Sequence, residues 1–428
     1  MKDVINIGII GFGTVGVGAV KLLLENADSI ARKVGSRLVI KRVADLDIAS
    51  PRPVAVDPSL LTTNAYDVLD DPEIDIVVEV IGGVKPADDY IKRALESGKH
   101  VVTANKELIA KEGSELLPLA SRLKRDLMFE ASVGGGIPII RPLKTCLAGN
   151  EILEVKGIVN GTTNYILTQM KDEGISFSEA LRQAQERGYA EADPSSDVDG
   201  HDAAYKIAIL ASIAFTSRAD VAAVYREGIR EISAEDLRYA DQLGFAVKLL
   251  AIAKRLNEGM SVRVHPAFVP KSHPLAHVNG VYNAIFVRGN AVGEVMFFGR
   301  GAGSEAAGSA VVGDIIDIAR NINTGATARV SCTCFDKLPM LGMENVSCRN
   351  YVRIIAEDKP RVLAAIAAEF ANYEVSIQSV LQRMLPDSCA EIVWLTHEAP
   401  EPSMKAALDA IRRLPVVKHI GSRIRVED

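Results

Sequence analysis

Residues 188–206, GYAEADPSSDVDGHDAAYK, gather several carboxylates ahead of one lysine, Lys206. Asp202 and Lys206 are four residues apart, so they share one face of a helix. The run that follows, IAILASIAF, is apolar nearly all round, which predicts that this helix is buried. A lysine where a helix enters an apolar core needs a partner or a chemical task. The carboxylates are Glu191, Asp193, Asp197, Asp199 and Asp202.

Three kinds of site begin with such a segment: a capped surface helix, a metal loop and a catalytic pocket. A surface pair of Asp202 with Lys206 would contribute only about 0.3–0.5 kcal/mol. An EF-hand calcium loop has its glycine after the third acid, whereas in DVDGHD (residues 197–202) the glycine follows the second. The spacing therefore disfavours calcium and leaves the surface helix and the pocket open.

A second chemical motif is the glycine-rich stretch GIIGFGTVG, which places Gly11, Gly13 and Gly16 in the pattern G-x-G-x-x-G. The motif follows a predicted strand, INIGII, and opens a predicted helix. In that context the glycines allow a tight turn, a close approach to a pyrophosphate and packing of the helix on the strand. The alternative is a plain strand–helix turn, but the context favours nucleotide binding.

The second predicted strand ends at Asp45. An acid at this position accepts a hydrogen bond from the ribose 2′-hydroxyl of NAD, whereas an arginine pairs with the 2′-phosphate of NADP. Asp45 therefore favours NAD, although Lys41, Arg42 and Arg52 are near enough in sequence to meet a phosphate. The simpler alternative is that Asp45 only caps a turn.

These residues need a scaffold, and the order of predicted elements supplies one. Up to about residue 135, apolar strands alternate with helices, which predicts a parallel, doubly wound Rossmann sheet. Residues 136–340 mix long helices with β-rich stretches, an α+β character. The helix at 308–322 is expected to pack back on the Rossmann domain. After a linker at 337–345, residues 349–428 follow the order βαββαβ of a ferredoxin-like module.

Composition limits the classes of function. The chain has 428 residues, 48% of them hydrophobic, and a net charge of -6, so no global field attracts nucleic acid or anionic lipid. Its longest apolar run is far shorter than the roughly 20 residues that span a bilayer. The start does not resemble a signal peptide. The odd number of cysteines, 5, argues against a disulfide framework, and Cys332-x-Cys334 lacks zinc spacing, so buried thiols and a cytoplasmic location are expected.

Ordered blocks along nearly the whole chain give it a family resemblance. It resembles homoserine dehydrogenase of the longer bacterial type, which has a C-terminal ACT domain. The blocks are GFGTVG, TANKELIA, FEASVGGGIPII, GIVNGTTNYIL, GYAEADPSSDVDGHDAAYKIAILASIAF, HPLAHVNGVYNAIFV and GRGAG. The resemblance implies NAD- or NADP-dependent interconversion of L-aspartate 4-semialdehyde and L-homoserine, on the route to threonine and methionine, by a homodimer or homotetramer.

The resemblance also assigns residues. The family's catalytic lysine falls on Lys206, and Lys106 of TANK is a second candidate that contacts the cofactor or the substrate. Substrate contacts fall on Glu191 and Asp202, with Asp197 and the turn at Gly188 beside them. Cofactor contacts fall on Gly11, Phe12, Gly13, Thr14, Val15, Gly16, Asp45, Lys106, Gly188, Gly301 and Gly303. The family's site for a monovalent cation, sodium or potassium, corresponds to Glu130, Val133, Gly135 and Ile137, which would bind it largely through backbone carbonyls.

The implied reaction would need both the carboxylates and the lysine of residues 188–206. The substrate's ammonium would bind Glu191 or Asp197. Hydride delivery to the aldehyde creates an alkoxide that must be stabilised and protonated. Because Asp202 favours the charged lysine, we expect Lys206 to act as the acid in reduction and as the base only in the reverse direction.

The chain departs from the family pattern at three places. Ala44 replaces an arginine before Asp45, which leaves the choice between NAD and NADP open. GSEAAGSA lacks a Pro-Thr pair after GRGAG. Arg361 stands where ACT domains usually have glycine. Its side chain would either block a threonine effector at this module or pair with the carboxylate of that threonine.

Two rival functions stay open at this point. A phosphorylating semialdehyde dehydrogenase would need a thiolate nucleophile such as Cys146 with a histidine beside it. A non-catalytic amino-acid sensor would retain the nucleotide fold and the ACT module without turnover.

Overall fold

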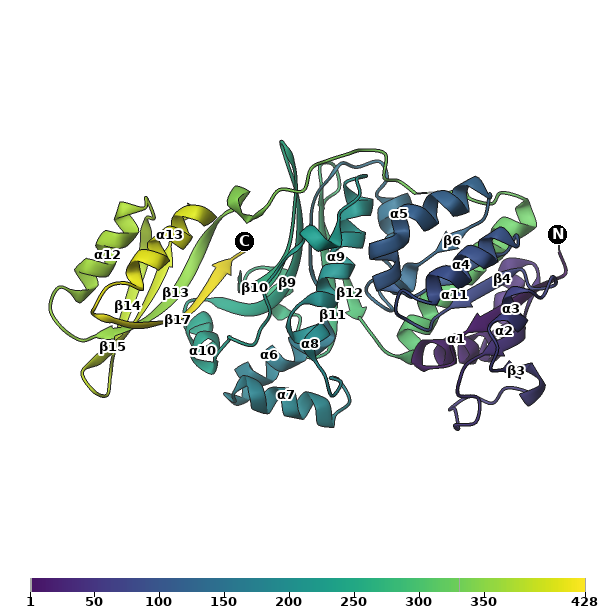
Figure 1. Cartoon of the computed structure of the whole chain (residues 1–428), viewed down its shortest axis with the longest axis horizontal. Helices are drawn as coiled ribbons and strands as arrows, with labels where there is room; N and C mark the ends of the chain where they lie inside the picture. Colours follow the sequence, from purple (N-terminus) through teal and green to yellow (C-terminus); the bar gives the residue numbers. More distant parts are fainter. Residues whose placement is uncertain (1, 331, 428) are drawn as a thin grey trace. The chain divides into compact units, whose positions relative to one another are not determined.

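The computed structural model describes residues 2–330 and 332–427 (Figure 1). It divides into two compact units, each built from three segments of the chain. The first unit comprises Met1–Val155, Tyr205–Ala222 and Tyr282–Leu338, and the second comprises Lys156–Ala204, Ala223–Val281 and Pro339–Asp428. Helix α9 (His201–Ala214) contributes residues to both units.

The first unit is built on a six-stranded sheet in the order β3-β2-β1-β4-β5-β6. All neighbouring strands in it are parallel. This is the doubly wound order of dinucleotide-binding domains and confirms the predicted Rossmann fold. The central strands are apolar on both faces because helices cover both sides. The strands are β1 (Val4–Ile10), β2 (Arg37–Ala44), β3 (Leu61–Thr62), β4 (Ile76–Glu79), β5 (His100–Thr103) and β6 (Leu127–Met128).

The helices of the first unit pack on this sheet. The predicted single helix after the glycine motif is two helices, because the chain turns at Asn26 between α1 and α2. Helix α11 packs along α1, where a β-carbon at Gly18 would lie 1.9 Å from the Ser304 carbonyl oxygen. The helices are α1 (Thr14–Glu25), α2 (Ala27–Val34), α3 (Tyr66–Leu69), α4 (Ala87–Glu96), α5 (Lys106–Arg122) and α11 (Ser304–Thr324).

The first unit also contains a β-hairpin of β11 (Tyr282–Gly289) and β12 (Gly293–Arg300). The last strand of the Rossmann sheet is short: β6 ends at Met128, and a 3₁₀ turn (Glu130–Ser132) follows. The reason is visible in the turn itself, where the Ser132 hydroxyl donates a hydrogen bond to the Phe129 carbonyl. The chain is thereby redirected into the glycine-rich segment that follows.

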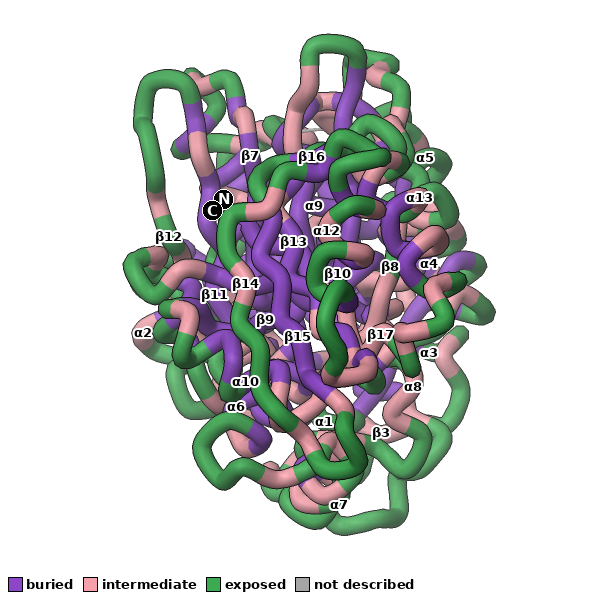
Figure 2. The backbone as a smooth tube through the Cα atoms, turned by 90° about the vertical axis from the view of Figure 1, so that its left-hand side faces the viewer, coloured by how far each residue is buried: buried purple, intermediate pink, exposed green. Residues whose placement is uncertain are grey.

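The second unit contains neighbouring strands in the order β9-β10-β17-β13-β15-β14, and the short strand β8 (Tyr225–Arg226) pairs with β10 at the side of this path. The C-terminal elements follow the predicted order βαββαβ, apart from the added two-residue strand β16 (Ala399–Pro400). Strands β13 and β15 are buried, whereas β14 is largely exposed (Figure 2). The strands are β9 (Phe245–Leu256), β10 (Gly259–Pro270), β13 (Ser347–Glu357), β14 (Ile377–Leu385), β15 (Cys389–Thr396) and β17 (Val417–Val426).

Helices of the second unit form two groups. The ACT module contributes α12 and α13, whose apolar faces share one core with the sheet. Helices α6, α7, α8 and α10 precede it in the chain. Their bounds are α6 (Gly161–Glu173), α7 (Phe177–Glu186), α8 (Ser195–Val198), α10 (Ala234–Gln242), α12 (Val362–Asn372) and α13 (Glu401–Ile411).

The predicted linker at 337–345 is anchored within the second unit rather than loose. Met260 N donates to the Pro339 carbonyl at 2.9 Å, and Leu341 N donates to the Met260 carbonyl at 2.8 Å. These bonds fix the segment at the start of β10 before the ACT module begins.

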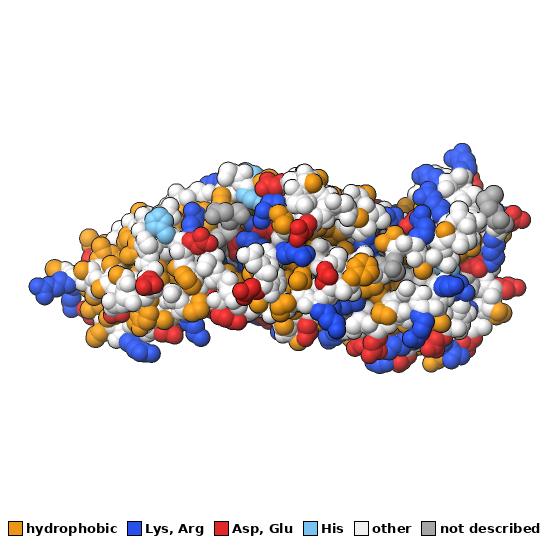
Figure 3. Space-filling model, turned by 90° about the horizontal axis from the view of Figure 1, so that it is seen from above, with side chains coloured by type: hydrophobic (Ala, Val, Ile, Leu, Met, Phe, Trp, Pro, Cys, Tyr) orange, Lys and Arg blue, Asp and Glu red, His pale blue; other side chains and the backbone are white. Residues whose placement is uncertain are grey.

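Acidic and basic side chains are interspersed over the face shown in Figure 3. Within residues 2–330 and 332–427, none of the helices combines the length and apolar character that a membrane span needs.

Candidate active site

The glycine motif forms the turn between β1 and α1. Gly11 has φ +107°, a conformation that favours glycine, and its N–H donates to the Ala44 carbonyl at 2.8 Å. A β-carbon at Gly16 would lie 2.1 Å from the Gly11 carbonyl oxygen, so the third glycine lets the helix approach the turn. The start of α1 thus lies at the glycine turn, the position from which helix N–H groups bind a pyrophosphate in this fold.

A cavity of about 430 Å³ lies beside this turn and is lined by Gly11, Gly13, Asp45 and Leu46 among others. The Asp45 carboxylate accepts hydrogen bonds from Phe12 N at 2.5 Å and from Asp47 N at 2.9 Å. Asp45 therefore does hold a turn, as the simpler alternative supposed, and it also lines the cavity. The two observations place a negative charge at the end of β2.

The three basic residues considered for a phosphate lie in different places. Arg52 Nε donates to the Phe12 carbonyl at 3.0 Å, so Arg52 stands at the glycine turn. Lys41 pairs with Asp71 and Glu73, and Arg42 donates to the Ser59 carbonyl at 3.4 Å.

A second cavity, of about 330 Å³, extends the first along the ends of β4 and β5 and shares its Val80–Gly82 wall. It is lined by Thr14, Val15 and Lys106, among others. Asn105 fixes this wall, because its side chain caps α5 by accepting from Leu108 N at 3.0 Å and donates to the Gly83 carbonyl at 2.6 Å. Lys106 is the first residue of α5 and is half-buried.

Lys206 lies on α9, and its side chain is buried with only 9% exposure. The neighbouring Tyr205 hydroxyl donates to Glu107 Oε1 at 3.4 Å, which links α9 to the start of α5 within the first unit. The residues next to Lys206 and Lys106 thus contact each other. The geometry brings the two candidate lysines to adjoining segments.

The acidic segment is organised around Asn160, a residue that was not singled out from the sequence. Asn160 Nδ2 donates to Asp197 Oδ1 at 2.7 Å and to Asp202 Oδ2 at 2.9 Å. Its Oδ1 accepts from Thr163 N and caps α6. Asp202 is buried and Asp197 half-buried, so one amide gathers two carboxylates that are separate in sequence. An asparagine is a frequent helix cap, but nothing in the sequence around Asn160 indicates that its amide gathers two carboxylates.

The remaining acids of the segment lie in a turn, in an ion pair and on the surface. Asp193 accepts from Ser195 N at 3.1 Å in a turn, and Asp199 forms an ion pair with Arg230 at 2.6 Å. Glu191 and Gly188 are exposed, and Gly188 has φ +71°.

Glu130 and the following glycines form a separate loop in the first unit. The buried Glu130 carboxylate accepts from the backbone N–H groups of Ile139, Ile140 and Arg141 at 2.6–2.8 Å. Its side chain is therefore committed to the backbone. Among the described residues, no hydrogen-bond donor is found for the carbonyls of Val133, Gly135 and Ile137. Unpartnered carbonyl oxygens suit a hard cation.

The same loop touches the GRGAG segment. A β-carbon at Gly135 would lie 2.4 Å from the Gly301 carbonyl oxygen, and Gly136 N donates to the Arg300 carbonyl at 3.1 Å. Just beyond Gly303, the Ser304 hydroxyl donates to the Thr14 carbonyl at 2.7 Å. Gly301 and Gly303 therefore lie between the Glu130 loop and the start of α1. No cluster of three or more metal-ligating side chains occurs within the described part of the chain.

Comparisons with known proteins agree along the whole chain. Family models described as "Homoserine dehydrogenase" and "Homoserine dehydrogenase, NAD binding domain" match residues 138–316 and 11–130, and an ACT domain model matches residues 350–416. A homoserine dehydrogenase of Synechocystis is 46% identical over 431 residues, covering 99% of each chain. The chain belongs to the homoserine dehydrogenase family.

Solved structures of the family match as well. A homoserine dehydrogenase from Thiobacillus denitrificans superposes with a TM-score of 0.95 at 42% identity, covering 100% of this chain and 99% of that one. A hyperthermophilic archaeal homoserine dehydrogenase, solved in complex with NADPH, has a TM-score of 0.62 at 30% identity and covers 74% of this chain and 98% of its own.

As a homoserine dehydrogenase, the protein is an oxidoreductase that uses a nicotinamide dinucleotide to interconvert L-aspartate 4-semialdehyde and L-homoserine. The family assignment decides against both rival functions. The thiol that a phosphorylating enzyme would need, Cys146, is exposed, and its sulfur lies 3.7 Å from Thr145 Oγ1, a hydroxyl and not a histidine.

Proposed function

We propose that Lys206 protonates the alkoxide formed when hydride reaches L-aspartate 4-semialdehyde, and accepts that proton when homoserine is oxidised. The burial of Lys206 on α9, beside the contact of Tyr205 with Glu107, is the observation that carries this proposal. A buried ammonium near the reacting oxygen stabilises developing negative charge strongly. Asp202, one turn earlier on α9, favours the charged lysine that an acid requires.

Lys106 takes a different role in this proposal. It lines the cavity at the carboxyl ends of β4 and β5, where ligands of doubly wound sheets bind. It therefore contacts the cofactor or the substrate without transferring the proton.

The substrate's ammonium group is bound by carboxylates of the 188–206 segment. Asn160 donates to both Asp197 and Asp202, so two carboxylates converge on one amide, and this concentration of negative charge supports binding of an ammonium group. Glu191 and the turn at Gly188 are exposed and contribute from the loop between α7 and α8.

Rates measured against pH in both directions test the role of Lys206. Lys206→Ala is expected to lower kcat by at least about 100-fold in each direction, as loss of a general acid–base group does. Lys206→Arg keeps the positive charge, so it should retain more of the reduction than of the oxidation. Lys271→Ala, which removes a surface lysine paired with Asp241, is the control. Near-normal rates in Lys206→Ala would end the proposal.

The cofactor preference is proposed from the charge at the end of β2. Asp45 lines the larger cavity and Ala44 supplies no cation, which supports NAD over NADP. Arg52 lies at the glycine turn and could pair with a 2′-phosphate, so NADP would also bind, but less tightly than NAD.

A monovalent cation, sodium or potassium, is proposed at the carbonyls of Glu130, Val133, Gly135 and Ile137. Support comes from the three carbonyls without a donor among the described residues and from the Glu130 side chain, which fixes the loop. A bound cation would hold this loop against Gly301 and thereby shape the cofactor cavity. Sodium or potassium should raise the melting temperature above that in tetramethylammonium at equal ionic strength, and an identical value would contradict the site.

Domain limits, location and assembly are proposed with the function. The limits are residues 1–135 for the cofactor domain, 136–340 for the substrate and dimerisation domain, and 349–428 for the ACT module. All five cysteines are free thiols, which supports the reducing cytoplasm. A homodimer or homotetramer, regulated by threonine through the ACT module, completes the proposal.

A further inference from the structure

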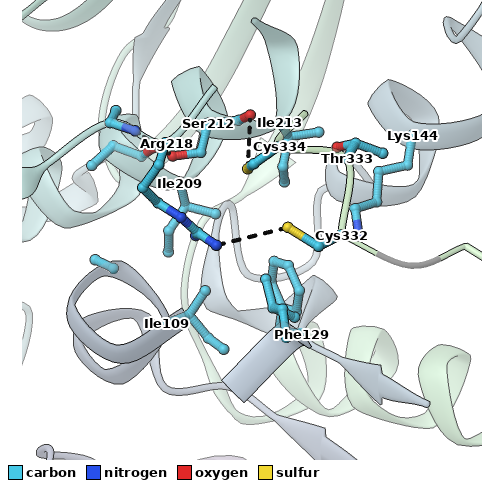
Figure 4. A pocket seen from close by; sticks show the side chains of 14 residues that line it. Ile109, Phe129, Lys144, Ile209, Ser212, Ile213, Arg218, Cys332, Thr333 and Cys334 are labelled. Atoms are coloured by element: carbon cyan, nitrogen blue, oxygen red, sulfur yellow. Dashed lines mark hydrogen bonds between the residues drawn. The ribbon is translucent and has the colours of Figure 1, made fainter. Parts of the chain in front are cut away.

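Cys332 and Cys334 share a small pocket in the first unit with residues of α5, α9 and the turn after Met128 (Figure 4). Arg218 Nη2 lies 3.7 Å from the Cys332 sulfur and donates to the Gly113 carbonyl of α5 at 3.1 Å. The Cys334 thiol donates to the Ser212 carbonyl of α9 at 3.5 Å. The two cysteines are half-buried and not fully buried as expected from the sequence.

The partners give the two sulfurs different protonation states. Cys332 faces a guanidinium, which can only donate, so its sulfur must accept and is best as a thiolate. Cys334 faces a carbonyl, which can only accept, so its sulfur must carry the hydrogen. Contact with the Cys334 thiol, together with the charges of Arg218 and Lys144, lowers the pKa of Cys332 to about 5 against the effect of burial. The pKa of Cys334 is raised correspondingly.

The charge around the pocket distinguishes a reactive thiol from a metal site. Arg218 and Lys144 line the pocket of Figure 4, whose described lining includes no carboxylate, and the second small cavity at Cys332 adds Arg125 and Asp126. Cations therefore outnumber acids around this sulfur, which disfavours a metal cation. Within the described residues the two thiols have no third metal-ligating side chain beside them. A thiolate between two cations is instead the arrangement that activates a cysteine toward an electrophile.

The small cavities around Cys332 limit the size of an electrophile that can reach its sulfur. Cys332 lines two small cavities, of about 10 and 20 Å³, each with room for roughly one water molecule. Hydrogen peroxide is little larger than water, whereas a glutathione-sized disulfide would not fit. Arg218 and Lys144 are also placed to stabilise the hydroxide that leaves when a peroxide is attacked.

We propose that Cys332 is a peroxide-reactive thiolate and that Cys334 is its resolving thiol. The Cys332 sulfur attacks one oxygen of hydrogen peroxide, so that an S–O bond forms, the O–O bond breaks and hydroxide leaves. The Cys334 sulfur then attacks the sulfenic acid, an S–S bond forms, and the hydroxyl leaves as water with the Cys334 proton. The dithiol is oxidised by two electrons and the peroxide is reduced.

The full-length protein treated with stoichiometric hydrogen peroxide near pH 6 tests this assignment. Peptide mass analysis should show a Cys332–Cys334 disulfide in the wild-type chain. In Cys334→Ser, where resolution is blocked, a dimedone adduct should form at Cys332. The exposed Cys146 is the internal reference, and Cys332 should be oxidised at least about tenfold faster, because the thiolate is the reacting form.

Variants at Arg218 test whether Cys332 reacts because a positive charge stabilises its thiolate or only because peroxide can reach its sulfur. Arg218→Met should slow oxidation of Cys332 about tenfold near pH 6, whereas Arg218→Lys, which keeps the charge, should slow it less. Cys332 oxidised no faster than Cys146, or an unchanged rate in a folded Arg218→Met protein, would overturn the assignment of Cys332. A sulfenic acid that persists in the wild-type chain would overturn the role of Cys334.

Discussion

At the scale of single residues, the charged groups of this enzyme are held in place by partners that are distant in sequence. Asp45 holds the backbone of the glycine turn, and Asn160 gathers Asp197 and Asp202. Each of these groups therefore combines a structural bond with a position at a proposed ligand site. A substitution that tests ligand binding at such a residue must therefore remove the charge of the side chain and keep its hydrogen bond.

Asp45→Asn meets that requirement and tests the cofactor preference. The amide oxygen can still accept from Phe12 N, but the negative charge that repels a 2′-phosphate is gone. We expect the ratio of kcat/KM for NADP to that for NAD to rise at least about tenfold, or about 1.4 kcal/mol. Steady-state oxidation of homoserine with each cofactor measures it. Asp45→Ala is the companion variant, in which both cofactors should lose efficiency because the turn loses its anchor.

Lys248 is a second buried charge, and it belongs to β9 of the second unit. Its ammonium donates to the Val278 carbonyl at 2.5 Å, to Asn279 Oδ1 at 2.9 Å and to Asn164 Oδ1 at 3.2 Å. These bonds hold α6 and the segment after Pro274–His277. Burial nevertheless lowers the pKa of Lys248 to about 7.

Lys248→Met should therefore destabilise the protein by about 3 kcal/mol, since three oxygens lose their donor. The pH dependence has a defined sign. Above pH 7 the unfolded chain still binds the proton that folded Lys248 has released, so this group makes wild-type stability rise with pH up to about 10. That rise should be missing in Lys248→Met. Urea unfolding at several pH values measures both effects, and Lys271→Met, at an exposed ion pair, should cost no more than about 1 kcal/mol.

Single residues also show how far the sequence predicts a site. The burial of Lys206 and the position of Asp45 followed from local patterns: an apolar helix and the end of a strand. Asn160 and Lys248 did not, because their partners are brought near only by tertiary packing. A reactive role for Cys332 could not be predicted from the sequence, because Arg218, which contacts its sulfur, is more than a hundred residues away in the chain.

At the scale of elements, the packing of α11 on α1 is the contact that brings Gly303 beside the cofactor turn. The third glycine of the motif was expected to allow close packing of α1, but Gly18 and Gly308 lie outside the motif. A β-carbon at Gly308 would lie 2.5 Å from the Gly18 carbonyl carbon, so the two helix backbones touch. The contact joins segments almost three hundred residues apart. We expected the helix at 308–322 to pack back on the Rossmann domain, but no periodicity in the sequence indicates that Gly18 and Gly308 are the residues that meet.

Gly18→Ala tests this contact. The added methyl group would lie 1.9 Å from the Ser304 carbonyl oxygen, and backbone cannot move aside as a side chain can. The helices must separate, at an expected cost of about 1–3 kcal/mol. Gly313→Ala on α11 is the matched control, because no atom lies within 4 Å of its added methyl group. That change should stabilise the helix by roughly 0.5–1 kcal/mol, so opposite shifts in melting temperature are expected.

At the scale of the whole molecule, buried charges tie the ACT module to the rest of the second unit. Asp236 of α10, which is fully buried, accepts from Arg353 Nε of β13 at 2.8 Å and from the Tyr351 hydroxyl at 3.0 Å. Arg263 of β10 donates to Glu427 at 2.6 Å, with both side chains 3% exposed. Burial opposes the charged form of Asp236, yet Arg353 keeps its pKa below the usual value. The module is therefore an integral part of the unit.

This docking changes how threonine regulation must be tested. A chain that ends after Asn345 loses Arg353 and Glu427 together with β13 and β17, so Asp236 and Arg263 lose their partners and the apolar surface under these strands is exposed to water. Because buried apolar surface contributes about 25 cal/mol per Å², we expect the truncated enzyme to unfold at a lower temperature and to lose activity whether or not threonine acts. Circular dichroism melting of the two chains checks this expectation, and equal melting temperatures would contradict it.

The full-length chain with Arg361→Gly is the sharper test. Arg361 precedes α12 with φ +74°, a conformation that favours glycine, so the substitution relieves backbone strain and opens the start of the helix. If the arginine side chain obstructs an amino-acid effector, the threonine concentration that halves activity should fall about tenfold, which corresponds to about 1.4 kcal/mol. Arg361→Ala, which removes the side chain and keeps the strain, should show a smaller fall. Activity unaffected by threonine in all three chains would leave the ACT module with a structural role alone.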